Sequence, residues 1–133
     1  MAAVIQRETD HVAPLLAPIP VAAVCRVEIH DSFAGSMPVW RRMEAGQSLT
    51  PYQHFDFLTA WQDTVGEHRQ LKPYIVVAYD TNDRPVMLLP LVTQREAGYT
   101  AAFFPAGKHS TFNMPLWDSA YAAAASADDV RQI

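Results

Sequence analysis

The stretch that decides the fold is residues 74–93, which read YIVVAYDTNDRPVMLLPLVT. It opens with β-branched and aromatic residues that are apolar on both faces, a pattern typical of a covered strand. Residues 80–84 then have the composition of a tight turn. Residues 86–93 return as the partner strand of a β-hairpin. Pro90 cannot donate a hydrogen bond to a strand ladder, so it indicates an edge or a bulge.

Downstream of the hairpin, a predicted strand over residues 99–104 leads into a polar island, Lys108 to Thr111, with Asn113 just beyond it. Aromatic and apolar residues flank the island, and Gly107 stands at its entrance, where glycine allows a positive φ. Hydrogen-bonding groups between apolar walls are typical of a small-molecule pocket. The alternative is a polar loop that joins two buried segments.

Upstream of the hairpin, residues 21–30 alternate as a strand with one wet face. Asp31 or Ser32 can cap a helix that follows. We expect this helix over residues 37–45, because Pro38 is tolerated only in the first turn. One face of the predicted strand carries Val24, Arg26, Glu28 and His30, and the other carries Cys25, Val27 and Ile29.

The clearest helix start is at Thr50, which is followed by Pro51 and by Gln53 three residues after the cap. We expect the helix to end at Gly66 and to bury one apolar stripe in the core. The stripe consists of Phe55, Leu58, Trp61 and Val65.

Composition excludes several classes of protein. The 133 residues are enough for one domain with a core, and only 18% are charged, which fits a surface that is partly covered. A net charge of −4 argues against binding to nucleic acid or anionic membranes. The single Cys25 cannot form an internal disulfide, so we expect a reducing compartment. No apolar run is long enough for a membrane span.

Both ends of the sequence carry signals. Residues 1–20 read as a disordered, proline-containing lead-in, and the charges ahead of the apolar run 13–24 argue against an export signal. Ser126 and Asp129 form a capping box with only four residues after it. We therefore expect residues 21–133 to be a domain truncated at its C-terminal end and part of a longer protein.

Three segments carry a family resemblance: residues 50–61, 73–91 and 107–117. With the order of strand, helices, hairpin and further strand, they resemble the N-terminal part of the cellulose-biosynthesis acetyltransferases of the CelD/BcsL type. These enzymes belong to the GNAT acyltransferase superfamily. The resemblance implies an α/β (α+β) half-fold, with a mixed, mainly antiparallel sheet of about four strands and two or three flanking helices.

The resemblance also implies a bacterial, cytoplasmic protein of roughly three times this length, with two GNAT-like halves. Such a protein transfers an acyl group from acetyl-CoA or another acyl-CoA to an amine or hydroxyl of a small-molecule acceptor, without a metal. The superfamily's donor motif has its nearest counterpart at residues 95–100, where Thr100 breaks the pattern and no helix is expected. The donor site is therefore expected in a C-terminal GNAT half outside this chain.

Within this chain, His109 is the candidate base, because its ordinary pKa lies near neutral pH. Lys108 can hold an anionic group, and Ser110 and Asn113 can orient the substrate by hydrogen bonds. The alternative is that these residues only hold the shape of the loop. The five histidines and the cysteine show no metal-ligand spacing. Two functions stay open: part of an acyltransferase, inactive alone, or a non-enzymatic ligand-binding or interaction module.

Overall fold

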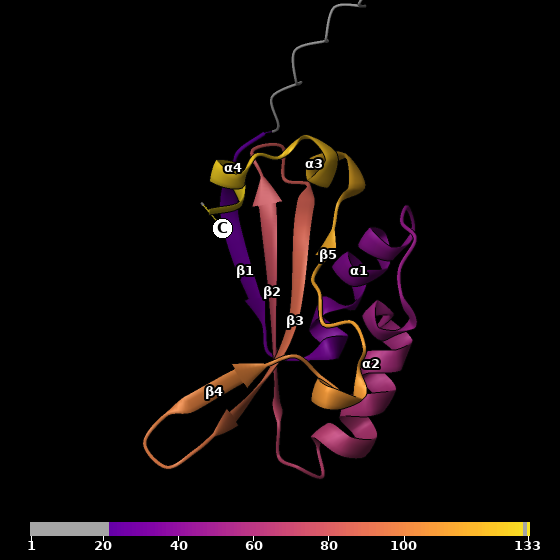
Figure 1. Cartoon of the computed structure of the whole chain (residues 1–133), viewed down its shortest axis with the longest axis vertical. Helices are drawn as coiled ribbons and strands as arrows, with labels where there is room; N and C mark the ends of the chain where they lie inside the picture. The colour runs from indigo at the N-terminus through magenta and orange to yellow at the C-terminus, as the bar shows by residue number, and fades with distance from the viewer. Residues whose placement is uncertain (1–21, 132) are drawn as a thin grey trace, which may run out of the picture.

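The structure is a computed structural model that describes residues 22–131 and 133. The predicted lead-in over residues 1–20 lies outside these residues. The described part is a mixed α+β fold with an open antiparallel sheet of five strands, as Figure 1 shows. Four strands lie side by side in the order β1-β2-β3-β4. The short strand β5 pairs with the same side of β3 as β4 does, but nearer the start of β3. The predicted fold class is confirmed.

The elements have the following bounds. The strands are β1 (Val24–His30), β2 (Lys72–Asp80), β3 (Pro85–Arg95), β4 (Thr100–Phe103) and β5 (Leu116–Trp117). The helices are α1 (Phe33–Glu44), α2 (Phe55–Trp61), α3 (Ser119–Ala124) and α4 (Ala127–Arg131). Short 3-10 turns cover Pro51–Gln53 and Gly107–His109, and a π-helical turn, Gln62–Gly66, continues α2.

The predicted hairpin is confirmed as β2 and β3, which pair antiparallel along most of their length. Pro90 lies in β3 between the residues that pair with β5 and those that pair with β4. Among the described residues, that side of β3 has no strand partner at Pro90, which explains why a residue without an N–H is tolerated there.

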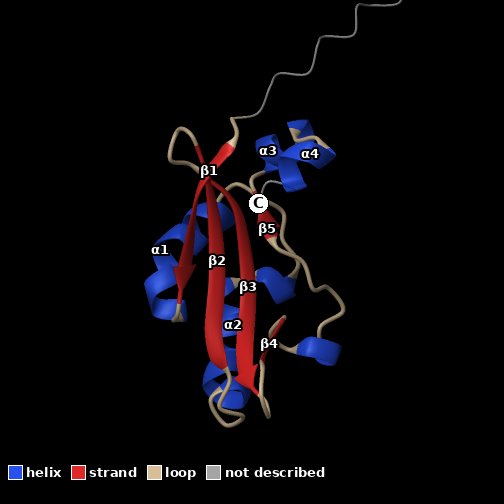
Figure 2. Ribbon diagram, turned by 90° about the vertical axis from the view of Figure 1, so that its left-hand side faces the viewer, coloured by secondary structure: helices blue, strands red, loops and turns tan. Residues whose placement is uncertain are grey.

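The main core lies on one face of the sheet, beneath α1 and α2 (Figures 1 and 2). Trp40 is fully buried, and its ring centroid lies 5.6 Å from those of both Phe33 and Phe55. Its indole Nε1 donates to the carbonyl of Gln53 at 3.1 Å, so the buried polar group is satisfied. This cluster joins the two helices to each other and to the sheet.

A smaller cluster lies on the opposite face, at the end of the sheet near α3 and α4. Tyr121 of α3 packs against Ala78 and Met87, and its ring stacks on Trp117 with centroids 6.2 Å apart. Helix α3 was missed by sequence reasoning, although Asp118 caps it through a bond from the Tyr121 N–H at 2.8 Å. The predicted capping box of Ser126 and Asp129 is confirmed at the start of α4.

Two helix predictions need correction. Helix α1 begins at Phe33 and not near residue 37, because Ser32 caps it by accepting from the Gly35 N–H at 3.2 Å. Pro38 therefore lies inside the helix. The second predicted helix is interrupted: the Thr50 N–H donates to Gln53 Oε1 at 3.1 Å, but this cap starts a 3-10 turn.

The predicted apolar stripe is also only partly correct. Phe55 and Leu58 are buried and Trp61 is half-buried, whereas Val65 is 38% exposed. The π-helical turn after Trp61 adds a residue to the helical repeat, so the periodicity that would bury Val65 is lost.

The predicted alternation is confirmed in β1 from Arg26 to His30, and the more exposed face is the apolar one. The bulge between Val24 and Arg26 puts Val24, predicted on the face of Arg26, in the smaller cluster instead. Val27 is 46% exposed and Ile29 is 56% exposed. The polar face lies on the side of the main core, where Glu28 accepts from the Tyr79 hydroxyl at 2.9 Å and Arg26 lies over the Tyr79 ring. Partners on β2 thus explain why the charged residues face inward.

Candidate functional site

The predicted polar island lies in the connection between β4 and β5. The buried Ala106 has a positive φ of 62°, and Gly107 follows with a φ of 45°, so the chain turns sharply at the entrance of the 3-10 turn. At the far end, Gln53 Nε2 donates to the carbonyl of Pro115 at 3.1 Å and ties the loop to the helices. The loop therefore runs between two fixed points.

Within the loop, two of the predicted site residues bond to its own backbone. The Ser110 hydroxyl donates to the carbonyl of Phe112 at 3.0 Å and accepts from the Phe112 N–H at 3.3 Å. Asn113 Nδ2 donates to the carbonyl of Gly107 at 3.3 Å. These bonds close the loop on itself, and among the described residues the carbonyl oxygen of the Asn113 side chain accepts no hydrogen bond.

The other two predicted residues, Lys108 and His109, are exposed. Within residues 22–131 and 133, neither side chain takes part in a hydrogen bond or an ion pair. The structure thus gathers the four residues on one short loop, where two hold its shape and two extend into solvent. An ammonium and an imidazole on a fixed loop can bind an anionic group and exchange a proton.

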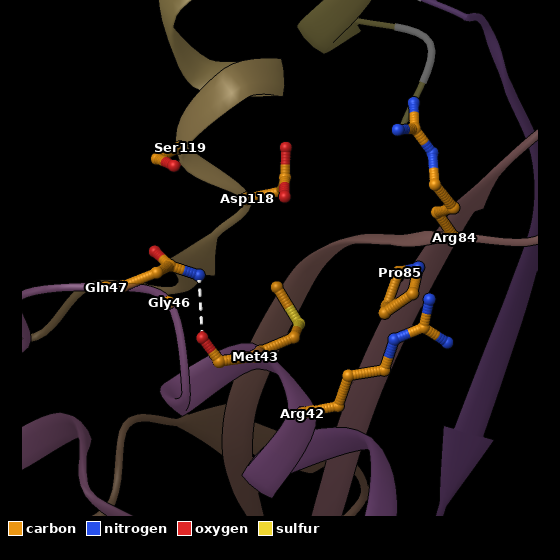
Figure 3. A pocket seen from close by; sticks show the side chains of 8 residues that line it. All are labelled: Arg42, Met43, Gly46, Gln47, Arg84, Pro85, Asp118 and Ser119. Carbon is orange, nitrogen blue, oxygen red and sulfur yellow. Dashed lines mark hydrogen bonds between the residues drawn. The ribbon is translucent and has the colours of Figure 1, made fainter.

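A small cavity lies at the end of the sheet where α1 ends, with a volume of about 180 Å³. Figure 3 shows Arg42 and Arg84 on one side of it and Gln47, Asp118 and Ser119 on the other. Arg84 is bound to the carboxylate of Asp80 through Nε at 3.0 Å and Nη2 at 2.9 Å. Gln47 Nε2 donates to the carbonyl of Met43 at 2.9 Å. The volume suits a small polar group rather than a whole substrate.

A larger hollow lies at the opposite end of the sheet, where β2 begins, and we call it the acidic groove. Its volume is about 700 Å³, within the roughly 300–1,000 Å³ of ordinary ligand sites. The start of α1, the end of α2 with its π-helical turn, and the first residues of β2 form its walls. Its charged residues are Asp31, Asp63, Glu67 and Lys72.

Three carboxylates against one ammonium favour a cationic ligand in the acidic groove. Its wall also contains two buried oxygens without a hydrogen-bond partner, Thr59 Oγ1 and Gln62 Oε1. Gln62 Nε2 is bound to the carbonyl of Leu71 at 2.9 Å, and the amide packs so closely on Gly66 that a Cβ there would lie 2.2 Å from Oε1. Both oxygens are buried, so the acceptors that the groove offers to a ligand are its exposed carboxylates.

Sequence reasoning missed the acidic groove because its charged residues are far apart in the chain. Only Asp63 and Glu67, four residues apart on a helical segment, share a face that local spacing can reveal. Neither the small cavity nor the acidic groove is lined by the predicted residues Lys108, His109, Ser110 or Asn113.

Two further observations concern the described residues. None of their helices is long and apolar enough to cross a membrane. They contain no group of three or more His, Cys, Asp or Glu side chains that could hold a metal ion. Comparison with family models, with curated proteins and with solved structures finds no match for this chain.

Proposed function

We propose that this chain is the N-terminal part of a bacterial, cytoplasmic GNAT-type acyltransferase that uses an acyl-CoA donor. One observation carries the proposal: the chain passes from β1 through two helices on one face of the sheet into three consecutive antiparallel strands. The resemblance rests on this order of elements, and its most specific segment follows β4. The association with cellulose biosynthesis comes from the resemblance alone.

In this proposal the acceptor lies against the loop formed by residues 105–115. The acceptor amine or hydroxyl attacks the acyl carbon of the thioester, its proton passes to His109, and the C–S bond breaks so that CoA leaves as the thiolate. Lys108 holds an anionic group of a substrate. The exposure of both side chains supports these roles. Ser110 and Asn113 fix the loop through the backbone bonds described above, and Asn113 has an oxygen left to accept from the acceptor.

The donor is assigned to the remainder of a longer chain. Residues 95–100, the nearest counterpart of the donor motif, form the connection between β3 and β4, and a strand follows them. Pyrophosphate binding by this superfamily needs backbone N–H groups at the start of a helix. A donor site elsewhere is therefore the consistent assignment.

The test measures CoA release by the complete protein with acetyl-CoA and a panel of amine and hydroxyl acceptors. His109→Ala should lower kcat by about 10²–10⁴-fold, the usual contribution of a general base. His68→Ala is the matched control, because His68 is also exposed but lies outside the loop. Unchanged turnover in His109→Ala would remove this residue from the mechanism, and absence of turnover with every acceptor would count against the enzyme.

The second candidate is a ligand-binding module without a donor site. The acidic groove favours it, because all of its walls lie in this chain. Thermal-shift titrations distinguish the two. For the enzyme, acetyl-CoA should stabilise the complete protein and leave this chain unchanged. For the module, a cationic amine should bind this chain in isolation and raise its free energy of unfolding by about 2.7 kcal/mol at a concentration one hundred times Kd.

A further inference from the structure

Strand β1 forms an outer edge of the sheet. Among the described residues, β2 is the only strand that pairs with it, so the backbone N–H and C=O groups along its other side have no strand partner. Figure 2 shows β1 at the margin of the sheet, with α1 behind it. An open strand edge is a ready template for pairing with another chain.

The side chains on one face of this edge are apolar. Val27 and Ile29 are about half exposed and lie beside Ala78 and Val76 of β2 in the ladder. Helices α3 and α4 cover the same face only near Val24, the first residue of β1. As far as residues 22–131 and 133 show, the rest of the strand therefore presents an open backbone edge beside an apolar surface that no helix covers.

We propose that β1 pairs with β1 of a second copy of this chain, antiparallel and about a two-fold axis at Val27. In this register, Arg26 of each copy lies opposite Glu28 of the other copy. On the other face, Val27 lies opposite Val27. The strand is thus complementary to itself in charge on one face and in hydrophobicity on the other, as an isologous dimer requires.

Neighbouring registers are less favourable. An axis at Arg26 or at Glu28 puts two like charges directly opposite each other, which destabilises an antiparallel pair. An axis at Ile29 puts the apolar Val27 opposite the charged Asp31, so the apolar pairing of the two copies is lost. The bulge between Val24 and Arg26 lies at the end of the strand and leaves Arg26 to His30 regular. Charge pattern and strand geometry therefore select the Val27 register.

The dimer would join two sheets into one. Val27 and Ile29 of both copies, with Val76 beside them, would form one apolar strip across the joined sheet. Helices α3 and α4 of each copy would cover the sheet at either end of this strip. Pairing would remove this strip's exposure at the edge and satisfy the free backbone groups. The inference is independent of the proposed acyl transfer.

The first test is the mass of this chain in solution by light scattering over a range of concentrations. The wild type should reach twice the monomer mass, and Val27→Lys should remain a monomer. Val130→Lys is the matched control, because Val130 is 44% exposed and lies on α4. It should dimerise as the wild type does. Circular dichroism verifies that each variant is folded.

A wild type that stays monomeric up to its solubility limit would overturn the proposal. A folded Val27→Lys variant that dimerises as well as the wild type would also overturn it, because the interface would then lie elsewhere.

The second test determines the register by disulfide trapping. In a Cys25→Ser background, Val27→Cys should cross-link across the axis, and Ile29→Cys should not. Equal cross-linking of Val27→Cys and Ile29→Cys in the Cys25→Ser background would contradict the Val27 register. So would the absence of any cross-link in variants that light scattering shows to be dimers.

Discussion

Two polar turns of similar length show how differently this chain uses its hydrogen-bonding groups: the β2–β3 turn at residues 80–84 and the loop at residues 107–113. In the first, Asp80 is 1% exposed, and its Oδ1 accepts from the N–H groups of Asn82 at 2.8 Å and Arg84 at 3.0 Å. In the second, two polar side chains close the loop and two extend into solvent. Polar side chains whose hydrogen bonds are all made within the protein stabilise the fold, whereas polar side chains that extend into solvent can bind a ligand.

The largest expected effect comes from removing the carboxylate of the saturated turn. Asp80→Ala should lower the free energy of unfolding by about 2–4 kcal/mol, since hydrogen bonds to a buried charge are lost. Urea denaturation measures the change. Asp83→Asn in the same turn is the control, because Asp83 is exposed, and asparagine tolerates its positive φ of 59°. Equal losses in both variants would show that burial of Asp80 is not what matters.

A smaller effect is expected from titrating the same group. Burial by itself raises the pKa of Asp80, but hydrogen bonds from the Arg84 and Asn82 backbone and from the Arg84 guanidinium outweigh it and hold the pKa below its ordinary 3.8. The stabilisation is therefore complete above that value and is lost as the pH falls through the lower pKa of the folded state.

Urea midpoints of the wild type should accordingly decrease below about pH 4, and those of Asp80→Asn should decrease less. Asp129 also has a lowered pKa, caused by its bonds to Ser126, but it is only half-buried and lies on the short helix α4. The Asp129→Asn variant should therefore keep most of the wild-type acid dependence. The same slope in Asp80→Asn as in the wild type would contradict the assignment to Asp80.

In the loop, backbone conformation should matter more than side-chain bonding. Gly107→Ala should cost about 1 kcal/mol, because alanine is strained at a φ of 45° even though no atom lies within 4 Å of the added Cβ. Gly46→Ala, at another open position without a positive φ, should not destabilise the protein. Thermal unfolding of the two variants measures the difference, and an equal loss in both would remove the conformational explanation.

The smallest effect on stability is expected where the largest effect on function is proposed. Lys108→Ala and His109→Ala should change the free energy of unfolding by less than about 0.5 kcal/mol, as is usual for exposed side chains without partners. Urea denaturation measures that change, and, if the proposed function holds, the substrate affinity of the proposed longer protein measures the effect of Lys108→Ala. A strong loss of stability in either variant would place these residues with Asp80, as parts of the fold.

Local signals in the sequence were sufficient for much of the fold. The hairpin of β2 and β3, its turn, and the capping box at Ser126 involve residues close in sequence, so their bonds follow from residue type and spacing. The loop with Lys108 and His109 was also found in this way, because its polar residues are contiguous. What these side chains contact could not be predicted, since the answer depends on how Gly107 and Ala106 turn the chain.

Errors arose where local signals competed. Pro38 argued for a late start of α1, but the Ser32 cap and the burial of Phe33 beside Trp40 outweighed the missing N–H of the proline. At Val65, the π-helical turn altered the repeat that the apolar stripe had implied. Both outcomes depend on packing energies, which cannot be read from the spacing of apolar residues in the sequence.

The sequence by itself determined the strands, the central hairpin and the caps at Ser32 and Ser126, because short-range hydrogen bonds and alternating polarity are properties of neighbouring residues. Only the tertiary structure decided which face of β1 is exposed and how Asp31, Asp63 and Glu67 meet in one groove. Those arrangements join residues that are distant in the chain. They are set by the packing of the helices on the sheet, because burial depends on every element at once.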